Sequence, residues 1–263
     1  MALSDLDVAH KMADAARSAI LPYFRSADLV SDNKDATGFD PVTQADRLAE
    51  QAMRAVLATH RPDDGVLGEE FGHQSGVSNR TWVLDPIDGT RAFISGTPTW
   101  GVLIALGQEG KAPDLGMIDQ PYIRERFWGD GAGAFCSAHD TSRSIKTRSA
   151  RALEDATLFT TFPEVGRATD RLGFEAVAAN VKLVRYGMDC YAYALLAAGQ
   201  IDLVIEAGLA AYDIQGPMAV IHAAGGIVSN WRGRSAHEGG QVVAAANAEI
   251  HAAALQYLQD YAD

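Results

Sequence analysis

The sequence contains little cysteine. Its 263 residues include only Cys136 and Cys190, which fit neither a CxxC motif nor a Cys/His metal-binding spacing. Two cysteines exclude a framework of several disulfides, and their positions argue against a zinc site. Free thiols are typical of a reducing compartment, so we expect a cytoplasmic protein.

Long apolar runs are also missing. No stretch approaches the ~20 consecutive apolar residues that a membrane-spanning helix needs. Residues 1–11 lack the basic-then-apolar pattern of a signal peptide. These two absences predict that a membrane is not among the partners of the protein.

Positive charge is scarce. The chain has 22 Lys and Arg residues against 34 Asp and Glu residues, a formal net charge of -12. Because a protein that neutralises nucleic-acid phosphates needs a basic face, we expect no nucleic acid as a partner. The contents of 48% hydrophobic and 21% charged residues are typical of a globular domain.

Hydrophobic periodicity predicts two helices near the N-terminus. The first runs from Leu6 to near Pro22, and the second starts at Thr43 and stops before Arg61. A short strand and three β-rich runs follow, at 82–84, 100–107, 115–119 and 124–128. Because turn residues separate the three runs, we expect them to form an antiparallel sheet.

We expect one compact unit made of two halves, residues 1–140 and 141–263. The turn residues of 129–133 and the polar run 137–151 mark the predicted boundary between them. Strands and helices alternate in the second half, which predicts an α/β layered architecture. The strands are expected at 157–161, 181–185, 201–206, 226–231 and 242–246, and the helices at 174–180, 190–198, 218–224 and from Asn247 to Tyr261.

Carboxylates follow two of the predicted strands. Gly68-Glu69-Glu70 comes after one apolar run, and Asp85-Pro86-Ile87-Asp88-Gly89-Thr90 comes after Trp82-Val83-Leu84. Pro86 fixes the local backbone and so directs the two aspartates. Mg²⁺ prefers such oxygen ligands, and the backbone N–H groups of a following helix suit a phosphate. The alternative interpretation of residues 85–90 is a simple turn in which Asp85 caps a helix.

These motifs, together with Tyr212-Asp213 and the later Ala223-Ala224-Gly225-Gly226, resemble the three signatures of the inositol monophosphatase superfamily. Its members are Mg²⁺-dependent, lithium-sensitive phosphatases. The resemblance spans nearly the whole chain in the right order. It implies an α/β fold of αβαβα type, the five-layer sandwich of inositol monophosphatase and fructose-1,6-bisphosphatase, often assembled as a homodimer. It also implies a small phosphorylated metabolite as substrate.

The resemblance further implies a set of metal ligands for two or three Mg²⁺ ions. Glu69, Asp85 and the backbone carbonyl of Ile87 would hold the first ion, and Asp85, Asp88 and Asp213 the second. In two-metal chemistry one ion activates the attacking water and the other stabilises the leaving alkoxide of an in-line displacement.

Phosphate binding and water activation are assigned by the same resemblance. Gly89 and Thr90 would receive the phosphate, and Thr90 would pair with Asp46. Thr90, Asp46 and Glu69 then form the predicted catalytic group around the attacking water. Lys34, in the loop before the second helix, matches a family lysine that helps to place a third metal.

Each of these residues also has a simpler interpretation. Asp46 lies where a capping box from Thr43 would place it, and Asp213 lies where a helix cap would be. Lys34 is equally compatible with a solvated lysine. Gln215-Gly216-Pro217 departs from the alanine-rich family pattern, so the start of this helix, and with it the pose of Asp213, stays open.

The second half and its neighbouring motifs resemble the histidinol-phosphate phosphatase branch. The resemblance is carried by Asp119-Gln120-Pro121, Glu125-Arg126 and the run 185–191. Because histidinol phosphate carries an ammonium and an imidazole, its pocket should contain carboxylates. Glu206 and Asp189 are therefore predicted to bind the substrate, although Glu206 could end an edge strand and Asp189 could cap a helix. The resemblance of the run 185–191 adds Arg185 to the predicted substrate-binding residues.

Two alternatives remain from the sequence. One is a phosphatase for inositol 1-phosphate or for sugar phosphates in general. The other is a non-catalytic binding or regulatory protein that keeps the fold; the presence of the complete ligand set argues against it.

Overall fold

The computed structural model describes residues 3–27, 29, 31–33, 41–139 and 141–263. Lys34 therefore lies outside the described residues, and its predicted role near a third metal stays a prediction. Within the described part of the chain, no helix combines the length and the apolar character needed to cross a membrane.

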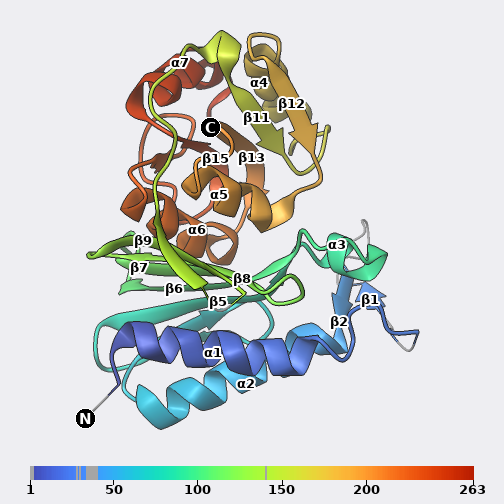
Figure 1. Cartoon of the computed structure of the whole chain (residues 1–263), viewed down its shortest axis with the longest axis vertical. Helices are drawn as coiled ribbons and strands as arrows, with labels where there is room; N and C mark the ends of the chain where they lie inside the picture. The colour runs from blue at the N-terminus through green and yellow to red at the C-terminus, as the bar shows by residue number, and fades with distance from the viewer. Residues whose placement is uncertain (1–2, 28, 30, 34–40, 140) are drawn as a thin grey trace.

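Two helices from the N-terminal part form one outer layer (Figure 1). They are α1 (Asp5–Ile20) and α2 (Gln44–His60), as the periodicity predicted. The capping box of α2 is present, because the Thr43 hydroxyl accepts a hydrogen bond from Ala45 N–H and the Asp46 side chain accepts one from Thr43 N–H. Apolar side chains of both helices pack against one face of the first sheet.

The first sheet has eight strands in the order β10-β9-β8-β7-β6-β5-β3-β4. Only β3 and β5 are parallel, so the predicted antiparallel arrangement of the central runs is confirmed. The strands are β3 (Gly65–Gly68), β4 (Gly72–Gln74), β5 (Arg80–Asp88), β6 (Gly101–Gln108), β7 (Leu115–Gln120), β8 (Glu125–Asp130), β9 (Gly133–Ala138) and β10 (Thr141–Ile145).

The sequence analysis missed β9 and β10. The residues of 129–133 form a hairpin between β8 and β9, and β10 pairs with β9 at the edge of the first sheet. The polar run 137–151 is therefore only partly a connection between halves, because it contains the edge strand β10, four of whose five residues are exposed. The predicted boundary at residue 140 falls between two paired strands of this sheet.

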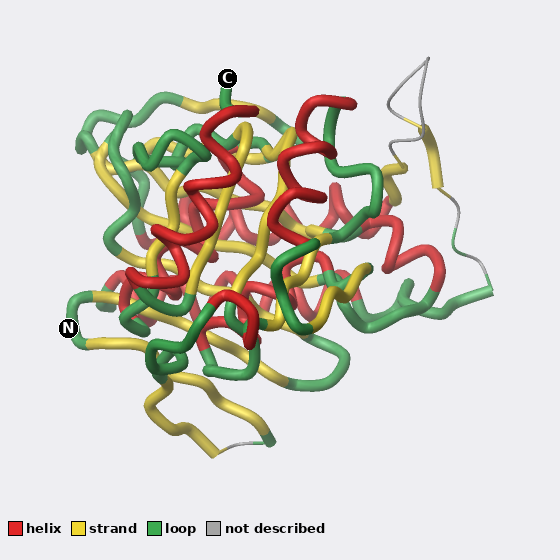
Figure 2. The backbone as a smooth tube through the Cα atoms, turned by 90° about the horizontal axis from the view of Figure 1, so that it is seen from above, coloured by secondary structure: helices red, strands yellow, loops and turns green. Residues whose placement is uncertain are grey.

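The second sheet has five strands in the order β12-β11-β13-β15-β14. They are β11 (Thr157–Thr160), β12 (Leu183–Tyr186), β13 (Leu203–Leu209), β14 (Ile227–Ser229) and β15 (Gly240–Ala245). Helices α4 (Ala168–Ala178) and α7 (Ala248–Leu258) cover its outer face, and seen from above helices lie over the strands (Figure 2). Asn247 caps α7 as predicted.

Helices α5 (Asp189–Ala197) and α6 (Ala211–Ala223) lie between the two sheets (Figure 1). Their apolar side chains form a core with residues from both sheets. The order of layers is therefore helices, sheet, helices, sheet, helices, which confirms the αβαβα fold. A small two-stranded sheet, β1 (Ser31–Asn33) with β2 (Pro41–Thr43), and the short helix α3 (Thr90–Ser95) complete the elements used below.

Helix α6 begins earlier than the sequence predicted. The expected start was Met218, but the helix begins at Ala211 and contains Pro217 in its interior. Three glycines let it lie close to the first sheet. A Cβ added to Gly116 would come within 2.3 Å of the Gly216 carbonyl oxygen, and one added to Gly129 within 2.9 Å of the Val220 Cα. Pro217 cannot donate the hydrogen bond that other residues in a helix interior donate.

Candidate active site

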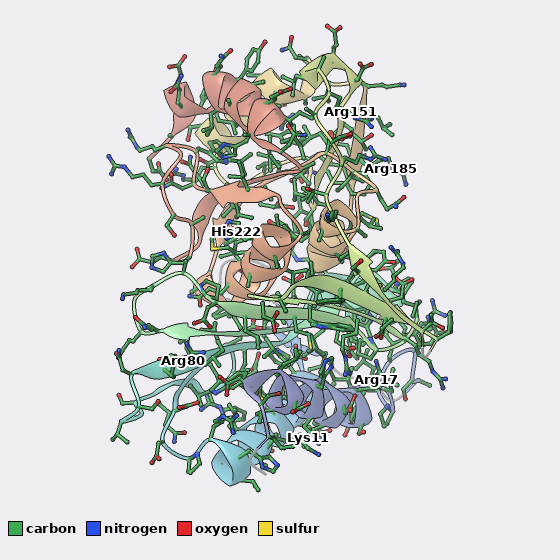
Figure 3. The ribbon with its side chains drawn as sticks, turned by 60° about the vertical axis from the view of Figure 1, so that its left-hand side comes forward. Lys11, Arg17, Arg80, Arg151, Arg185 and His222 are labelled. Atoms are coloured by element: carbon green, nitrogen blue, oxygen red, sulfur yellow. The ribbon has the colours of Figure 1, made fainter. Side chains whose placement is uncertain are left out.

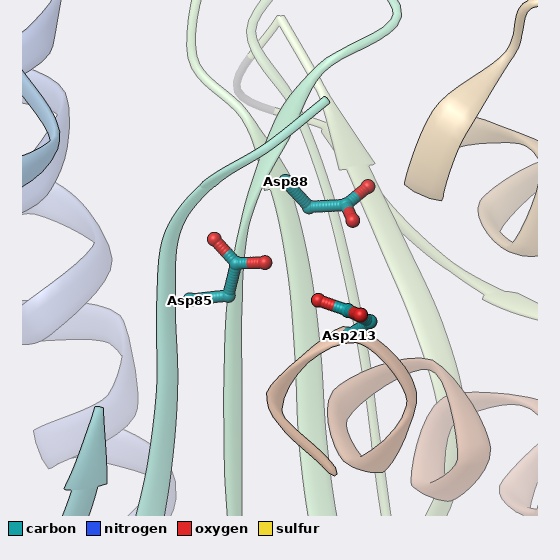
Figure 4. Close-up of side chains that lie close together, drawn as sticks. All are labelled: Asp85, Asp88 and Asp213. Atoms are coloured by element: carbon teal, nitrogen blue, oxygen red, sulfur yellow. The ribbon is translucent and has the colours of Figure 1, made fainter. Parts of the chain in front are cut away.

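Three aspartates converge where the first sheet meets α6 (Figure 4). Asp85 and Asp88 come from the end of β5, and Asp213 comes from the first turn of α6. One carboxylate oxygen from each lies within 4.8 Å of the others. The structure therefore brings together three of the predicted metal ligands from segments more than a hundred residues apart.

A bulge in β5 places both of its aspartates on the same face of the sheet. Residues three apart in a regular strand point to opposite faces, because side chains alternate with a period of two. Asp85 pairs with Leu103 and Asp88 with Gly101, so three steps on β5 match only two on β6. The extra residue restores a common direction. Ile87 N–H donates a hydrogen bond to Asp85 Oδ1 at 3.0 Å and holds this turn.

Backbone hydrogen bonds fix the other two carboxylates. Asp88 Oδ2 accepts the N–H of Cys190, at the start of α5, at 2.7 Å. Asp213 Oδ2 accepts the N–H of Ala210 at 2.7 Å, which is the bond of a residue in the first turn of a helix. Asp213 thus caps α6 and also belongs to the cluster, so the two interpretations of this residue are compatible.

The cluster is electrostatically costly without a cation. Burial raises the pKa of Asp85 well above its usual value, and the negative charges of Glu69 and Asp88 add to the effect. Burial likewise raises the pKa of Asp88, followed by the charge of Asp213. Divalent cations with a preference for oxygen ligands, such as Mg²⁺, would remove this repulsion. The donor set therefore fits the metal that the sequence predicts.

Glu69 and Ile87, the remaining predicted ligands, lie beside the cluster. Glu69 lines the same cavity as Asp88 and Asp213, and its N–H donates to the Leu84 carbonyl at 3.2 Å. The Ile87 carbonyl accepts a hydrogen bond from the Thr90 hydroxyl at 3.2 Å. Both residues are therefore near the three aspartates, and their roles as ligands stay predictions.

The predicted phosphate loop is a sharp turn at the start of α3. Gly89 has a φ of 86°, which a residue with a side chain rarely adopts. A Cβ at this position would also come within 2.8 Å of the Asp189 side chain. Gly89 and Thr90 both line the cavity. Only glycine fits here, because the loop must approach another carboxylate closely.

The predicted pair of Thr90 and Asp46 does not form in the described part of the chain. Asp46 Oδ2 accepts hydrogen bonds from the Thr43 N–H at 2.8 Å and the Thr43 hydroxyl at 2.6 Å, while Thr90 bonds to Ile87. The capping interpretation of Asp46 is therefore correct for this structure. Burial raises the pKa of Asp46 to about 6, partly offset by the bonds from Thr43.

A cavity of about 350 Å³ opens beside the aspartates. Residues from both halves of the chain line it: Glu69, Asp88, Gly89, Thr90, Arg91, Thr161, Phe162, Asp189, Cys190, Tyr193, Glu206, Ala207, Gly208, Leu209, Tyr212 and Asp213. Because the two sheets contribute opposite walls, a ligand here would touch the phosphate loop on one side and β13 on the other.

Glu206 is buried at the far wall. Its Oε1 accepts hydrogen bonds from the Thr161 N–H at 2.7 Å and the Thr161 hydroxyl at 2.9 Å, and its Oε2 accepts one from the Thr160 hydroxyl at 3.1 Å. Burial raises the pKa of Glu206 to about 7 despite these bonds. A positively charged ligand would favour its ionised form.

Asp189 lies between Glu206 and the phosphate loop. Its Oδ2 accepts the Thr99 hydroxyl at 2.9 Å, and its backbone has a φ of 45°. Such a conformation is uncommon for a residue with a side chain and marks positions that the surrounding structure constrains. Burial raises the pKa of Asp189, while the Thr99 bond and the charge of Arg91 lower it.

Arg185 is not where the sequence analysis expected it. It lies on the edge strand β12, is exposed, and is not among the residues that line the cavity (Figure 3). Three of the four residues of this strand, Leu183, Arg185 and Tyr186, are exposed. The cavity of this chain therefore gives no support to a role of Arg185 in substrate binding, which stays a prediction.

The motif Asp119-Gln120-Pro121 with Glu125-Arg126 also lies outside the cavity. Asp119 Oδ1 accepts hydrogen bonds from Arg126 at 2.7 Å and from Arg17 of α1 at 3.0 Å. The Gln120 side chain accepts the N–H of Ile123 and so closes the turn between β7 and β8. The hydrogen bonds of Asp119 join α1 to the sheet, and the residues of the motif are not among those that line the cavity.

Several residues that line the cavity are not predicted from the sequence, among them Arg91, Phe162 and Tyr193. Arg91 and Phe162 face each other from opposite walls, with the guanidinium carbon 4.8 Å from the ring centroid. Tyr193 belongs to the apolar helix α5, where nothing in the sequence separates it from core residues. Of these three residues, only Arg91 could have been identified from the sequence, because it directly follows Thr90 in the phosphate loop.

Several known proteins have sequences and folds similar to those of this chain. The model of the "Inositol monophosphatase family" matches residues 3–263. The chloroplastic bifunctional phosphatase IMPL2 of Arabidopsis thaliana is 40% identical, covering 96% of this chain and 74% of the relative. Histidinol-phosphatase of Mycobacterium tuberculosis is 36% identical, covering 93% and 94%. The solved structure of an inositol monophosphatase from Zymomonas mobilis has a TM-score of 0.85 and 40% identity, covering 97% of each chain.

Proposed function

Because the chain belongs to the inositol monophosphatase family and is one of its metal-dependent phosphatases, we propose that it converts L-histidinol phosphate and water to L-histidinol and phosphate. The observation that carries the proposal is the pair of carboxylates, Asp189 and Glu206, that line the cavity in addition to the predicted metal ligands. The relatives named histidinol-phosphatase support it.

The charge of the cavity favours a cationic alcohol. L-Histidinol phosphate carries an ammonium and an imidazole, whereas inositol 1-phosphate offers only hydroxyl groups besides its phosphate. An ammonium between Asp189 and Glu206 would be a charge-assisted contact, about twice as strong as one between neutral groups. It would also favour the ionised form of Glu206, because burial raises the pKa of this residue to about 7.

The mechanism assigns the reacting groups to the two ends of the cavity. Family members use Mg²⁺, and two or three ions held by Glu69, Asp85, Asp88, Asp213 and the Ile87 carbonyl would neutralise the phosphate and lower the pKa of a water molecule. The proposed role of Gly89 and Thr90 is to orient the phosphate for in-line attack. Positioning and charge neutralisation supply most of the rate in such reactions.

Glu69, Thr90 and Asp46 keep their proposed role around the attacking water. Glu69 lines the cavity next to Asp213, and Thr90 lies at its phosphate end. The raised pKa of Asp46, about 6, suits a group that shares a proton with its surroundings near neutral pH. In the described structure this carboxylate bonds to Thr43, so any link to Thr90 would require rearrangement on substrate binding.

The substrate preference of the purified protein tests the proposal. With Mg²⁺ present we expect kcat/KM for L-histidinol phosphate to exceed that for inositol 1-phosphate about 100-fold, which is about 2.7 kcal/mol of transition-state binding. Loss of one charged contact in Glu206→Gln or Asp189→Asn should lower the histidinol phosphate value by about 10- to 100-fold. Inositol 1-phosphate turnover should change less, since it carries no cation.

Glu125→Gln is the matched control for these variants. Glu125 is also a carboxylate that accepts a hydrogen bond from a hydroxyl, that of Tyr191, but it lies outside the cavity. We expect its substrate preference to equal that of the wild type. Equal losses on both substrates in Glu206→Gln would contradict a role in recognising the cation.

Hydrolysis of inositol 1-phosphate or of sugar phosphates in general is the second candidate. The likeness to the Zymomonas mobilis inositol monophosphatase favours it. Similar kcat/KM values for both substrates in the experiment above would support this candidate and overturn the first.

Assembly as a homodimer in the cytoplasm stays a prediction of the family resemblance. Light scattering coupled to gel filtration tests the first part: a dimer of the 28.0 kDa chain should have a mass near 56 kDa. A mass near that of one chain at micromolar concentration would contradict it.

A further inference from the structure

Tyr193 of α5 has a buried hydroxyl without a partner. Its side chain is 4% exposed and lines the cavity together with Asp88 and Glu206. Within the described part of the chain, the hydroxyl makes no hydrogen bond. An unpaired buried hydroxyl is unfavourable, and nearly all such groups in proteins find a partner. A partner supplied by a ligand would account for its place in the wall of this cavity.

The surroundings make this hydroxyl a donor. Burial raises the pKa of Tyr193 well above its usual value, and the negative charges of Glu206, Asp88 and Asp213 raise it further. The phenol therefore keeps its proton at neutral pH. Its ligand partner must then be an acceptor, such as an oxygen that carries negative charge.

The position of Tyr193 indicates which acceptor this is. The proposed function places the phosphate at the metal cluster and the phosphate loop, and the alcohol at Asp189 and Glu206. The ester oxygen joins these two parts of the substrate. Tyr193 lines the cavity together with one carboxylate from each of the two corresponding ends, Asp88 and Glu206. A substrate that spans the cavity carries its ester oxygen between those two ends.

We propose that the Tyr193 hydroxyl is a catalytic group that donates a hydrogen bond to the ester oxygen of the bound phosphate monoester. The inference rests on the proposed function for the direction in which the substrate lies. As the water oxygen bonds to phosphorus, the P–O ester bond breaks and its electron pair moves to the ester oxygen. A donor already placed there stabilises this negative charge as it develops.

The proton balance of the reaction does not require Tyr193 to ionise. The attacking water loses one proton, and the departing alkoxide gains one to become the alcohol. The phenol keeps its own proton and contributes by its dipole alone. Its benefit depends on how much negative charge the ester oxygen acquires, which is large for an alkyl alcohol and small for a stabilised phenolate.

This dependence gives a sharp experiment with Tyr193→Phe, which removes only the hydroxyl. We expect kcat for L-histidinol phosphate to fall about 30-fold, somewhat less than the loss of about 100-fold or more that removal of one oxyanion-hole donor causes. The kcat for 4-nitrophenyl phosphate, whose leaving group needs little stabilisation, should fall less than about 3-fold. The KM for both esters should change little.

Tyr191→Phe is the matched control on the same helix. Its hydroxyl donates to Glu125 at 2.5 Å, and neither residue lines the cavity. We expect unchanged kcat for both esters in this variant. In thermal unfolding with EDTA, Tyr193→Phe should be at least as stable as the wild type because it loses an unpaired group, whereas Tyr191→Phe should be less stable because it loses a hydrogen bond.

Several outcomes would overturn the inference. Equal losses on both esters would mean that Tyr193 only maintains the shape of the site, and calorimetry would then also show weaker Mg²⁺ binding. Unchanged kcat on both esters would mean that the hydroxyl does not reach the ester oxygen. If the wild type prefers inositol 1-phosphate, the proposed function fails, but the same comparison with that alkyl ester still tests Tyr193.

Discussion

Asp88→Asn should lower kcat/KM about 1000-fold, which corresponds to about 4 kcal/mol of lost transition-state stabilisation. The carboxylate of Asp88 lies within 4.8 Å of those of Asp85 and Asp213, so it is shared by the proposed metal site. Asparagine keeps the size of the side chain and the acceptor for the Cys190 N–H. It removes the negative charge that holds a cation, and calorimetry should show weaker Mg²⁺ binding.

The fold should survive this substitution. In EDTA the Asp88→Asn protein should unfold at a higher temperature than the wild type, because one of several repelling carboxylates is gone. Asp114→Asn provides the control: this aspartate pairs with Arg80 at the surface, away from the cavity, and its variant should keep full activity. An Asp88→Asn protein within tenfold of wild-type activity would show that the metal assignment is wrong.

Chelation should destabilise the protein most at neutral and alkaline pH. The folded-state pKa values of Asp85 and Asp88 are raised, while those of the unfolded chain are near 4. Above about pH 4 the unfolded chain loses protons that the folded chain retains, so the free energy of unfolding falls as pH rises toward the folded pKa values. Glu206 and Asp46, with pKa values of about 7 and 6, act in the same direction.

Bound Mg²⁺ should remove this penalty because it stabilises the ionised carboxylates. At pH 7.5 we expect Tm to be about 10 °C higher with saturating Mg²⁺ than with EDTA, and the difference to shrink to about 2 °C near pH 5. Differential scanning calorimetry at both pH values measures it. A difference independent of pH would mean that the cluster does not bind the metal through these carboxylates.

The sequence predicts most of the layered fold, for reasons visible in particular elements. Helices α1 and α2 have clear apolar stripes and capping boxes, so their bounds follow within a few residues. The central strands of the first sheet are apolar on both faces and separated by turn residues. Edge strand β10 lacks this signal, because four of its five residues are in solvent and polar side chains suffice there.

The candidate site was predictable where one short motif determines it. Asp85 and Asp88 share a strand end, and their common direction follows from a bulge that the sequence only hints at through Pro86. Asp213 was identified by resemblance, while the start of its helix was not, because Pro217 is rare inside helices.

Tertiary contacts determine which of the remaining residues line the cavity. Arg185 and Tyr193 lie eight residues apart, yet the one predicted to bind substrate is exposed on β12 and the one overlooked lines the cavity. A charged side chain is the more obvious candidate for substrate binding, and nothing in the sequence separates Tyr193 from the core residues of its helix. Only the packing of α5 between the two sheets does, since it depends on partners distant in the sequence.

Two glycines of the first sheet, Gly116 and Gly129, determine how closely α6 approaches the sheet and so influence the spacing of the three aspartates. Gly116 lies against the backbone of Gly216, and Gly129 lies against the backbone of Val220. These close contacts set the distance between α6 and the sheet. Asp213 belongs to that helix, whereas Asp85 and Asp88 belong to the sheet. The spacing of the three carboxylates therefore depends on glycines that are not among them. The carboxylates proposed to bind the alcohol, Asp189 and Glu206, lie on α5 and β13, so substrate preference could change while the spacing of the proposed metal ligands is kept.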